Sequence, residues 1–223
     1  MGTLAEERLE RLARMRLYVI TGERGDVAET AATVEAALAG GADVIQLRKK
    51  TMQKDEQYRL AVLLRGLTRA RDALLIVNDH PDLAIAADAD GVHLGQDDFP
   101  PRMIRSLHGF AGRLLGRSTH SLVQALAGVA DGVDYLGVGP VYATPTKAGR
   151  PPVGCELVAE VAAGIDLPYV AIGGIDDATA PSVLAAGARA IAVVRAVYDA
   201  PDPQEAARRL RGLVTQSRPA VTA

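Results

Sequence analysis

Short apolar runs recur along the chain, and each ends at a charged or hydrogen-bonding residue before a helix-like segment begins. The last run, 190–194, is apolar throughout, as expected for a parallel strand that is covered on both faces. The pattern predicts about eight strands, at residues 17–21, 44–47, 74–77, 91–94, 114–116, 135–139, 169–172 and 190–194.

The segments between these runs are rich in Ala and Leu, with apolar residues three and four positions apart, a spacing that indicates helices. A last helix is expected to begin with Asp202 as its N-cap and Pro203 in its first turn. An opening helix is expected at 4–15, and the others are expected at 27–38, 58–70, 122–130, 157–163 and 178–186.

Alternating strands and helices in about eight regular repeats predict a (β/α)8 TIM barrel with an extra N-terminal helix. A doubly wound open sheet is the main alternative. We favour the closed barrel because about eight regular repeats with no chain left over are typical of it. We expect residues 1–16 to form a helix packed on the barrel, 17–215 to form the catalytic barrel, and 216–223 to be a disordered tail.

Charge and composition exclude some functions. The 25 basic and 27 acidic residues give a net charge of -2, so no overall field favours nucleic acid or an acidic membrane. The single cysteine, Cys155, excludes an internal disulfide and fits a reducing compartment. The sequence has no signal-peptide pattern and no apolar stretch of about 18 residues. We expect a soluble, cytoplasmic protein that binds small molecules, and whether it forms a homo-oligomer stays open.

Parallel strands in a barrel bring all their carboxyl ends to one face, so residues far apart in sequence converge there. Asn78 and Asp79 follow the third strand, and Asp97 and Asp98 follow the fourth. Hard oxygen ligands on neighbouring strands suit Mg²⁺. The alternative for each carboxylate is a helix cap or a solvated loop.

Basic residues follow the second and sixth strands. Arg48 and Lys50 share a face if the strand continues, because alternate residues of a strand point the same way. Guanidinium and ammonium groups at this position suit phosphate. Lys49 is interpreted as part of a solvated turn. Lys147 lies in a long, glycine-containing segment, 143–152, which we interpret as a mobile lid.

Glycines end the seventh strand, at Gly173 and Gly174, and Val194-Arg195 ends the eighth. This position is the usual phosphate seat of a barrel, although two tight turns that pack a helix on a strand would give the same pattern.

The remaining polar residues support no nucleophilic or zinc chemistry. No nucleophile elbow surrounds Ser118, which is interpreted as a hydrogen-bond donor to a ligand. His120 is as well suited to begin a helix as to titrate in a reaction, and His93 lies inside a strand run, where we expect it to be packed. No His/Cys cluster has zinc spacing.

These motifs resemble those of thiamine-phosphate synthases, in the family's order, from about residue 17 to residue 196. Any one motif is weak, whereas the ordered set is specific. The matching segments are 46–50 (QLRKK), 78–79 (ND), 90–98 (DGVHLGQDD), 116–120 (GRSTH), 139–147 (GPVYATPTK) and 171–175 (AIGGI).

The resemblance implies a transferase that joins a hydroxymethylpyrimidine diphosphate to a thiazole phosphate, by dissociation to a pyrimidine-stabilised cation. It assigns Mg²⁺ to Asp79 and Asp98. It assigns the pyrimidine diphosphate to Gln46, Arg48, Lys50, Asn78, Ser118 and Lys147, of which Arg48, Lys50 and Lys147 are catalytic. It assigns the thiazole phosphate to Thr144, Thr146, Gly174, Val194 and Arg195, the last standing where many members have serine.

Two other functions remain open. Thiazole tautomerase-like relatives move protons on the thiazole phosphate without diphosphate or Mg²⁺, and His120 would then be the acid or base. A non-catalytic sensor would bind a phosphorylated metabolite at Gly174 and Arg195 without turnover.

Overall fold

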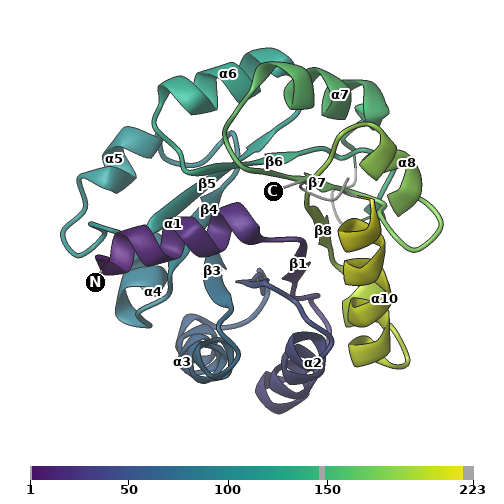
Figure 1. Ribbon diagram of the computed structural model, residues 1–223. Helices are drawn as coiled ribbons and strands as arrows, with labels where there is room; N and C mark the ends of the chain where they lie inside the picture. The colour runs from purple at the N-terminus through teal and green to yellow at the C-terminus, as the bar shows by residue number, and fades with distance from the viewer. Residues whose placement is uncertain (1, 146–148, 218–223) are drawn as a thin grey trace.

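The computed structural model describes residues 2–145 and 149–217. Within them, eight parallel strands follow one another around a closed barrel, and β8 pairs with β1 (Figure 1). This closing pair excludes the open sheet and confirms the predicted TIM barrel. The strands are β1 (Leu17–Ile20), β2 (Val44–Leu47), β3 (Leu74–Asn78), β4 (Gly91–Leu94), β5 (Leu114–Thr119), β6 (Tyr135–Val138), β7 (Tyr169–Ile172) and β8 (Ile191–Val193).

Helices surround the barrel, and most of them connect one strand to the next (Figure 1). The long ones carry apolar faces that pack on the outside of the sheet, with Val34 and Leu64 in the shared core. The described helices are α1 (Leu4–Arg14), α2 (Val27–Ala39), α3 (Lys54–Ala70), α4 (Pro81–Ala86), α5 (Pro101–Arg105), α6 (Leu122–Ala130), α7 (Gly154–Gly164), α8 (Ala180–Ala185), α9 (Arg195–Tyr198) and α10 (Pro203–Gln216).

The structure differs from the sequence-based expectation mainly in the helices. It adds α4, α5 and α9, and α3 and α7 begin three or four residues earlier than the expected 58 and 157. The added helices have six residues or fewer, too few to repeat an apolar face. The start of α10 is as predicted: Asp202 accepts a hydrogen bond from the Glu205 amide, with Pro203 in the first turn.

Successive strand residues alternate between the two faces of the barrel wall. Leu17 and Val19 pack outward against the helices, whereas Tyr18 and Ile20 point into the barrel with its inner cluster. The inward positions also include glycines, and a Cβ on Gly116 would lie 2.2 Å from the Tyr135 Cζ atom. Small residues therefore leave room for a few large side chains in the barrel interior.

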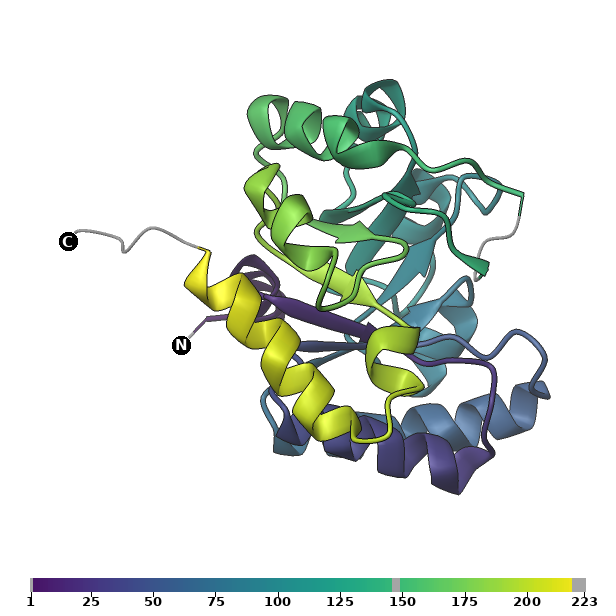
Figure 2. The same ribbon diagram turned by 90° about the vertical axis from the view of Figure 1, so that its right-hand side faces the viewer.

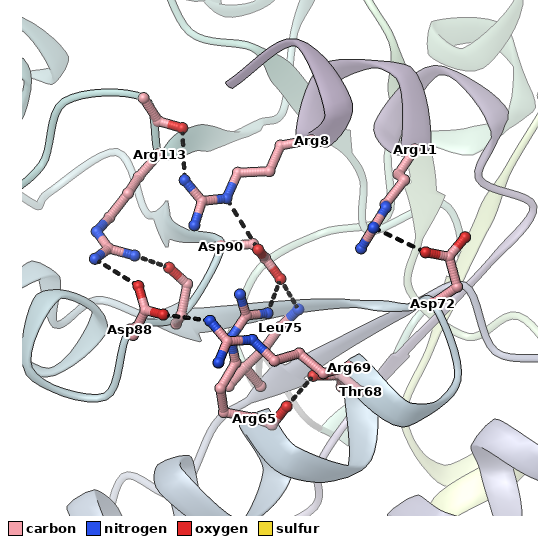
Figure 3. A network of polar contacts seen from close by, with 12 residues as sticks. Arg8, Arg11, Arg65, Thr68, Arg69, Asp72, Leu75, Asp88, Asp90 and Arg113 are labelled. Carbon is pink, nitrogen blue, oxygen red and sulfur yellow. Dashed lines mark hydrogen bonds and ion pairs between the residues drawn. The ribbon is translucent and has the colours of Figure 1, made fainter. Parts of the chain in front are cut away.

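The first helix, α1, covers the amino-terminal ends of the strands. Its Leu12, together with Met15, joins the inner cluster, and in Figure 2 the strand arrows point away from this side. Arg8 of α1 bonds the buried Asp90 carboxylate (Figure 3). The opposite end, where the strands finish, is left to the connecting loops. No described helix is long and apolar enough to cross a bilayer.

Candidate active site

A cavity of about 310 Å³ opens at the carboxyl ends of the strands. All eight strands or the residues that follow them contribute to its wall, so the predicted convergence on one face occurs. Of the predicted site residues, the wall includes Gln46, Arg48, Asn78, Ser118, Thr144, Gly174, Val194 and Arg195. Thr146, Lys147 and the middle of the expected lid lie outside the described residues.

Arg48 continues the inward-facing side of β2, as the alternation predicted. Its side chain is 16 % exposed, and its Nη1 atom lies 3.0 Å from the Glu23 carboxylate. Glu23 also accepts longer hydrogen bonds, of 3.3 Å, from the Lys50 backbone amide and the Thr51 hydroxyl. The loop after β1 therefore holds the guanidinium at the wall of the cavity. Glu23 was not predicted, because it lies in a charged loop with no motif around it.

The two predicted metal ligands are not among the residues that line the cavity, but they lie beside each other, and Asp79 directly follows Asn78, which lines it. The Asp79 carboxylate is 3.0 Å from the Lys50 ammonium, and the Asp98 carboxylate accepts a 2.6 Å hydrogen bond from the Gly95 amide. Burial, and then the neighbouring Asp79 carboxylate, raise the pKa of Asp98 above its ordinary value. Asp79 also has a left-handed backbone, with φ of 62°, a conformation that aspartate adopts more often than most residues other than glycine.

The carboxylate pair and Lys50 thus form a compact group of two anions and one cation. Among the described residues no cluster of three or more His, Cys, Asp or Glu side chains is suited to hold a metal by itself. Two carboxylates are enough for Mg²⁺, because this ion keeps several waters and takes further ligands from substrate phosphates.

Five buried polar side chains from five strands form the bottom of the cavity, and we call them the polar floor. Gln46 Nε2 donates to the Tyr18 hydroxyl at 2.7 Å, and the Tyr18 and Tyr135 hydroxyls are 2.9 Å apart. Tyr135 lies 3.1 Å from His93 Nδ1, and His93 Nε2 lies 3.0 Å from the Ser118 hydroxyl. Burial raises the pKa of both tyrosines, so both hydroxyls keep their protons.

The polar floor was only partly predicted. Gln46 and Ser118 were expected site residues and His93 was expected to be packed, but the two tyrosines were counted as strand core. The signal that could have found them is their place in the alternation. Each tyrosine stands at an inward position in an otherwise apolar strand.

The predicted phosphate seat lies on the opposite side of the cavity. Gly173 and Gly174 have φ of 103° and 66°, and a Cβ on Gly174 would lie 2.7 Å from the Tyr142 Cβ atom. Only glycine fits this close approach without strain. The turn presents its backbone next to Val194 and Arg195 of the neighbouring strand end. Arg195 begins α9, which has only four residues, and its side chain is exposed.

Two sequence-based interpretations need correction or refinement. Lys49 does not lie in a solvated turn: it is 4 % exposed, and its ammonium group donates to the Gly25 carbonyl at 3.0 Å and to the Tyr198 hydroxyl at 3.1 Å. His120 precedes α6 rather than starting it, since Ser121 is the N-cap. His120 lines the cavity, and its Nδ1 atom bonds the Gly139 carbonyl.

Fold and cavity together define a TIM-barrel protein with a charged ligand site at the carboxyl ends of its strands. A model described as thiamine monophosphate synthase matches residues 17–197, and the chain belongs to this family.

Individual relatives agree with this assignment. A thiamine-phosphate synthase of Mycolicibacterium vanbaalenii is 47% identical over 212 residues, covering 89% of this chain and 94% of the relative. One of Gloeobacter violaceus is 51% identical over 193 residues, but this chain, 86% of which is covered, spans only 55% of that relative's length. The solved thiamine phosphate pyrophosphorylase of Pyrococcus furiosus superimposes with a TM-score of 0.83 at 36% identity, covering 97% of this chain and 100% of that one.

Proposed function

We propose that the chain is a thiamine-phosphate synthase. It joins 4-amino-2-methyl-5-(diphosphooxymethyl)pyrimidine to 4-methyl-5-(2-phosphooxyethyl)thiazole and releases diphosphate. The single observation that carries the proposal is the grouping of cations and carboxylates at one cavity mouth. Arg48 lines the wall, and Lys50 contacts Asp79 beside Asn78. This arrangement suits a substrate that carries a diphosphate and a metal ion.

The cations act on the leaving group. Negative charge builds on the diphosphate as its bond to the methylene carbon breaks, and fixed positive charge stabilises that charge without a protein nucleophile. Arg48 offers a forked donor set and Lys50 a mobile point charge. Arg48 now bonds Glu23, so this ion pair loosens or shares its donors when diphosphate enters. Lys147, which lies outside the described residues, is proposed as the third cation.

Asp79 and Asp98 would hold Mg²⁺. The fit rests on the donor set: two hard carboxylates lie together, and among the described residues only Lys50 makes an ion pair with them. Burial, and then the neighbouring Asp79 carboxylate, raise the pKa of Asp98. When bound, Mg²⁺ supplies charge neutralisation at the phosphate oxygens. The adjacent Gly95 amide and Lys50 keep the two carboxylates in place.

The rest of the cavity positions the two carbon frameworks. Gln46 and Ser118 at the floor bind the pyrimidine ring, and Asn78 binds the diphosphate beside them. Thr144, Gly174, Val194 and Arg195 bind the thiazole phosphate across the cavity, with Thr146 from the segment that is not described. The thiazole nitrogen is thereby held in line with the methylene carbon, and bound substrates exclude water that would quench the cation.

We propose that the enzyme works in the cytoplasm on these small molecules, with neither nucleic acid nor membrane as a partner. The proposal rests on the family and on the near-neutral net charge of -2. The formation of a homo-oligomer stays a prediction.

The direct test mixes purified protein with both substrates, with and without Mg²⁺, and measures diphosphate release. We expect release that requires the thiazole phosphate and is lost with EDTA. Proton exchange on the thiazole phosphate without diphosphate release would favour the tautomerase-like alternative, in which His120 is the acid or base. Saturable binding without any turnover would favour a sensor.

A variant sharpens this test. We expect Lys147→Ala to lower kcat far more than it weakens binding of the pyrimidine diphosphate, because a cation that acts on developing charge matters most in the transition state. Lys54→Ala is the matched control, since Lys54 pairs with the exposed Asp82 on the surface. Equal kcat in Lys147→Ala and in the wild type would refute the role proposed for Lys147.

A further inference from the structure

Lys49 is a buried cation that the proposed mechanism does not use. It stands between Arg48 and Lys50 after β2, and because alternate residues share a face, its side chain leaves the cavity that Arg48 lines. Lys49 is 4 % exposed, and among the described residues no carboxylate lies within ion-pair distance of its ammonium group. Burying a cation is costly unless its protons are hydrogen-bonded.

The hydrogen bonds of Lys49 use its whole ammonium group. Such a group has three protons, and three oxygens accept them. Lys49 Nζ donates to the Arg24 carbonyl, to the Gly25 carbonyl at 3.0 Å and to the Tyr198 hydroxyl at 3.1 Å. An apolar side chain of the same length would fill the space but offer these oxygens no donor. The charged group therefore adds a connection from β2 to the loop after β1 and to α9.

The loop after β1 also contacts Arg48. Glu23 directly precedes Arg24, and its carboxylate lies 3.0 Å from Arg48 Nη1. At the start of the same loop, the Thr21 hydroxyl accepts a 2.8 Å hydrogen bond from the Arg48 amide. The place of the Arg48 guanidinium at the cavity wall thus depends on where this loop lies, and Lys49 holds the loop one residue beyond Glu23.

The short helix α9 is connected to the same loop. Tyr198 ends α9, and its hydroxyl donates to the Arg24 carbonyl at 2.9 Å. A Cβ on Gly22 would lie 2.6 Å from the Tyr198 Cδ1 atom, so the ring packs directly on the loop. Arg195, which lines the cavity, begins α9 only three residues before Tyr198. A shift of Tyr198 would therefore move Arg195 as well.

We propose that Lys49 is a positioning residue for both phosphate-binding sides of the cavity. Its ammonium group holds the loop after β1 and α9 against the end of β2. It thereby places Arg48 for the diphosphate and Arg195 for the thiazole phosphate, without itself lining the cavity. The effect on turnover rests on the proposed function, whereas the contacts of the ammonium group do not.

The contacts are tested first, on the ligand-free protein. Protons of exposed ammonium groups exchange rapidly with water, whereas burial and hydrogen bonding slow the exchange. We expect a ¹H–¹⁵N ammonium signal near neutral pH that is lost in Lys49→Met and exchanges faster in Tyr198→Phe, which removes one acceptor. Absence of this signal, or an unchanged exchange rate in Tyr198→Phe, overturns the proposed contacts.

Steady-state kinetics test the positioning in Lys49→Met, which keeps the length of the side chain and removes its charge. We expect kcat to fall and KM for the thiazole phosphate to rise, each about tenfold, the effect of one lost hydrogen bond from a charged group. Arg8→Met is the matched control, because it also removes a buried cation, at the amino end of the barrel. It should lose stability and keep both kinetic values.

A double variant shows whether Lys49 acts through the loop. Glu23→Gln already weakens the hold on Arg48, so Lys49→Met should lower kcat less in that background than in the wild type. The rise in KM for the thiazole phosphate depends on α9 and should be the same in both backgrounds. An equal fall in kcat in the two backgrounds overturns the role of Glu23 in the connection.

The outcomes separate the two claims. Wild-type kcat and KM in folded Lys49→Met, or a change in only one of them, overturns the positioning role. Circular dichroism checks the folding, and if Lys49→Met does not fold, Tyr198→Phe decides by smaller changes in the same directions. If the wild type releases no diphosphate from the two substrates, the proposed function fails and the positioning role with it, while proton exchange at Lys49 still decides the contacts.

Discussion

The two ends of the barrel handle buried charge in opposite ways. At the amino end, Asp90 is 2 % exposed and lies between Arg8 at 2.9 Å and Arg65 at 2.6 Å, and it also accepts from the Leu75 amide (Figure 3). One carboxylate thus meets two guanidinium groups from α1 and α3. Burial lowers the pKa of Arg65, as expected for a cation held away from water.

At the carboxyl end the ratio of carboxylates to cations is reversed. Asp79 and Asp98 lie together, and among the described residues only Lys50 makes an ion pair with them. The amino-end carboxylate is satisfied within the chain, so that end contributes to stability. The Asp79 and Asp98 pair at the carboxyl end has one negative charge more than Lys50 balances, and a cation from solution can balance it. The comparison teaches that, among the described residues, the carboxylates beside the ligand site have fewer cationic partners than Asp90 has.

The largest expected effect is at the amino end. Asp90→Asn leaves two buried guanidinium groups without their counterion, and we expect the free energy of unfolding to fall by about 3–5 kcal/mol. Urea denaturation measures the change. The kcat of the folded protein is expected to stay at the wild-type value. A loss of stability below about 1 kcal/mol would break the comparison.

The next effect is at the carboxyl end. We expect Asp98→Asn to lower the rate of diphosphate release by about 10²–10³-fold, the size of one lost electrostatic contact in a transition state. Its free energy of unfolding should equal or exceed that of the wild type, because a like-charge contact with Asp79 is removed. A variant that loses stability and keeps its rate would reverse the assignment of the two ends.

The raised pKa of Asp98 predicts a dependence on pH without Mg²⁺. Because protonated Asp98 is favoured in the folded chain, the folded state binds more protons between the ordinary pKa of 3.8 and the raised one. The Asp98 contribution to the free energy of unfolding therefore falls as pH rises through this window. We expect Asp98→Asn to remove that slope in urea titrations, and Mg²⁺ to reduce it. Identical slopes in the variant and the wild type would contradict the pKa shift.

The smallest effect is expected at the surface near Asp90. Arg11 and Asp72 form a 2.8 Å ion pair in which the Asp72 side chain is 71 % exposed. We expect Asp72→Asn to change the free energy of unfolding by less than about 1 kcal/mol, since water screens exposed pairs. Asparagine tolerates the positive φ of 55° at this position. A loss as large as that of Asp90→Asn would mean that burial does not separate the two pairs.

Much of the fold could be predicted because eight buried strands leave eight apolar runs. The short helices α4 and α5 could not, because each begins with a proline and ends before an apolar face can repeat. Part of the site also follows from strand order, since Asp79 and Asp98 end neighbouring strands. Lys49 shows the limit: only the folded chain brings the carbonyl of Gly25 to its ammonium group.

The most direct test measures how ligands change stability. Mg²⁺ and the pyrimidine diphosphate, added together at about 100 times the dissociation constant, should raise the free energy of unfolding of the wild type by about 2.7 kcal/mol. We predict the same increase in Asp90→Asn, whose altered charge is far from the ligand, and little or no increase in Asp98→Asn. Equal stabilisation of Asp98→Asn and the wild type would contradict the account.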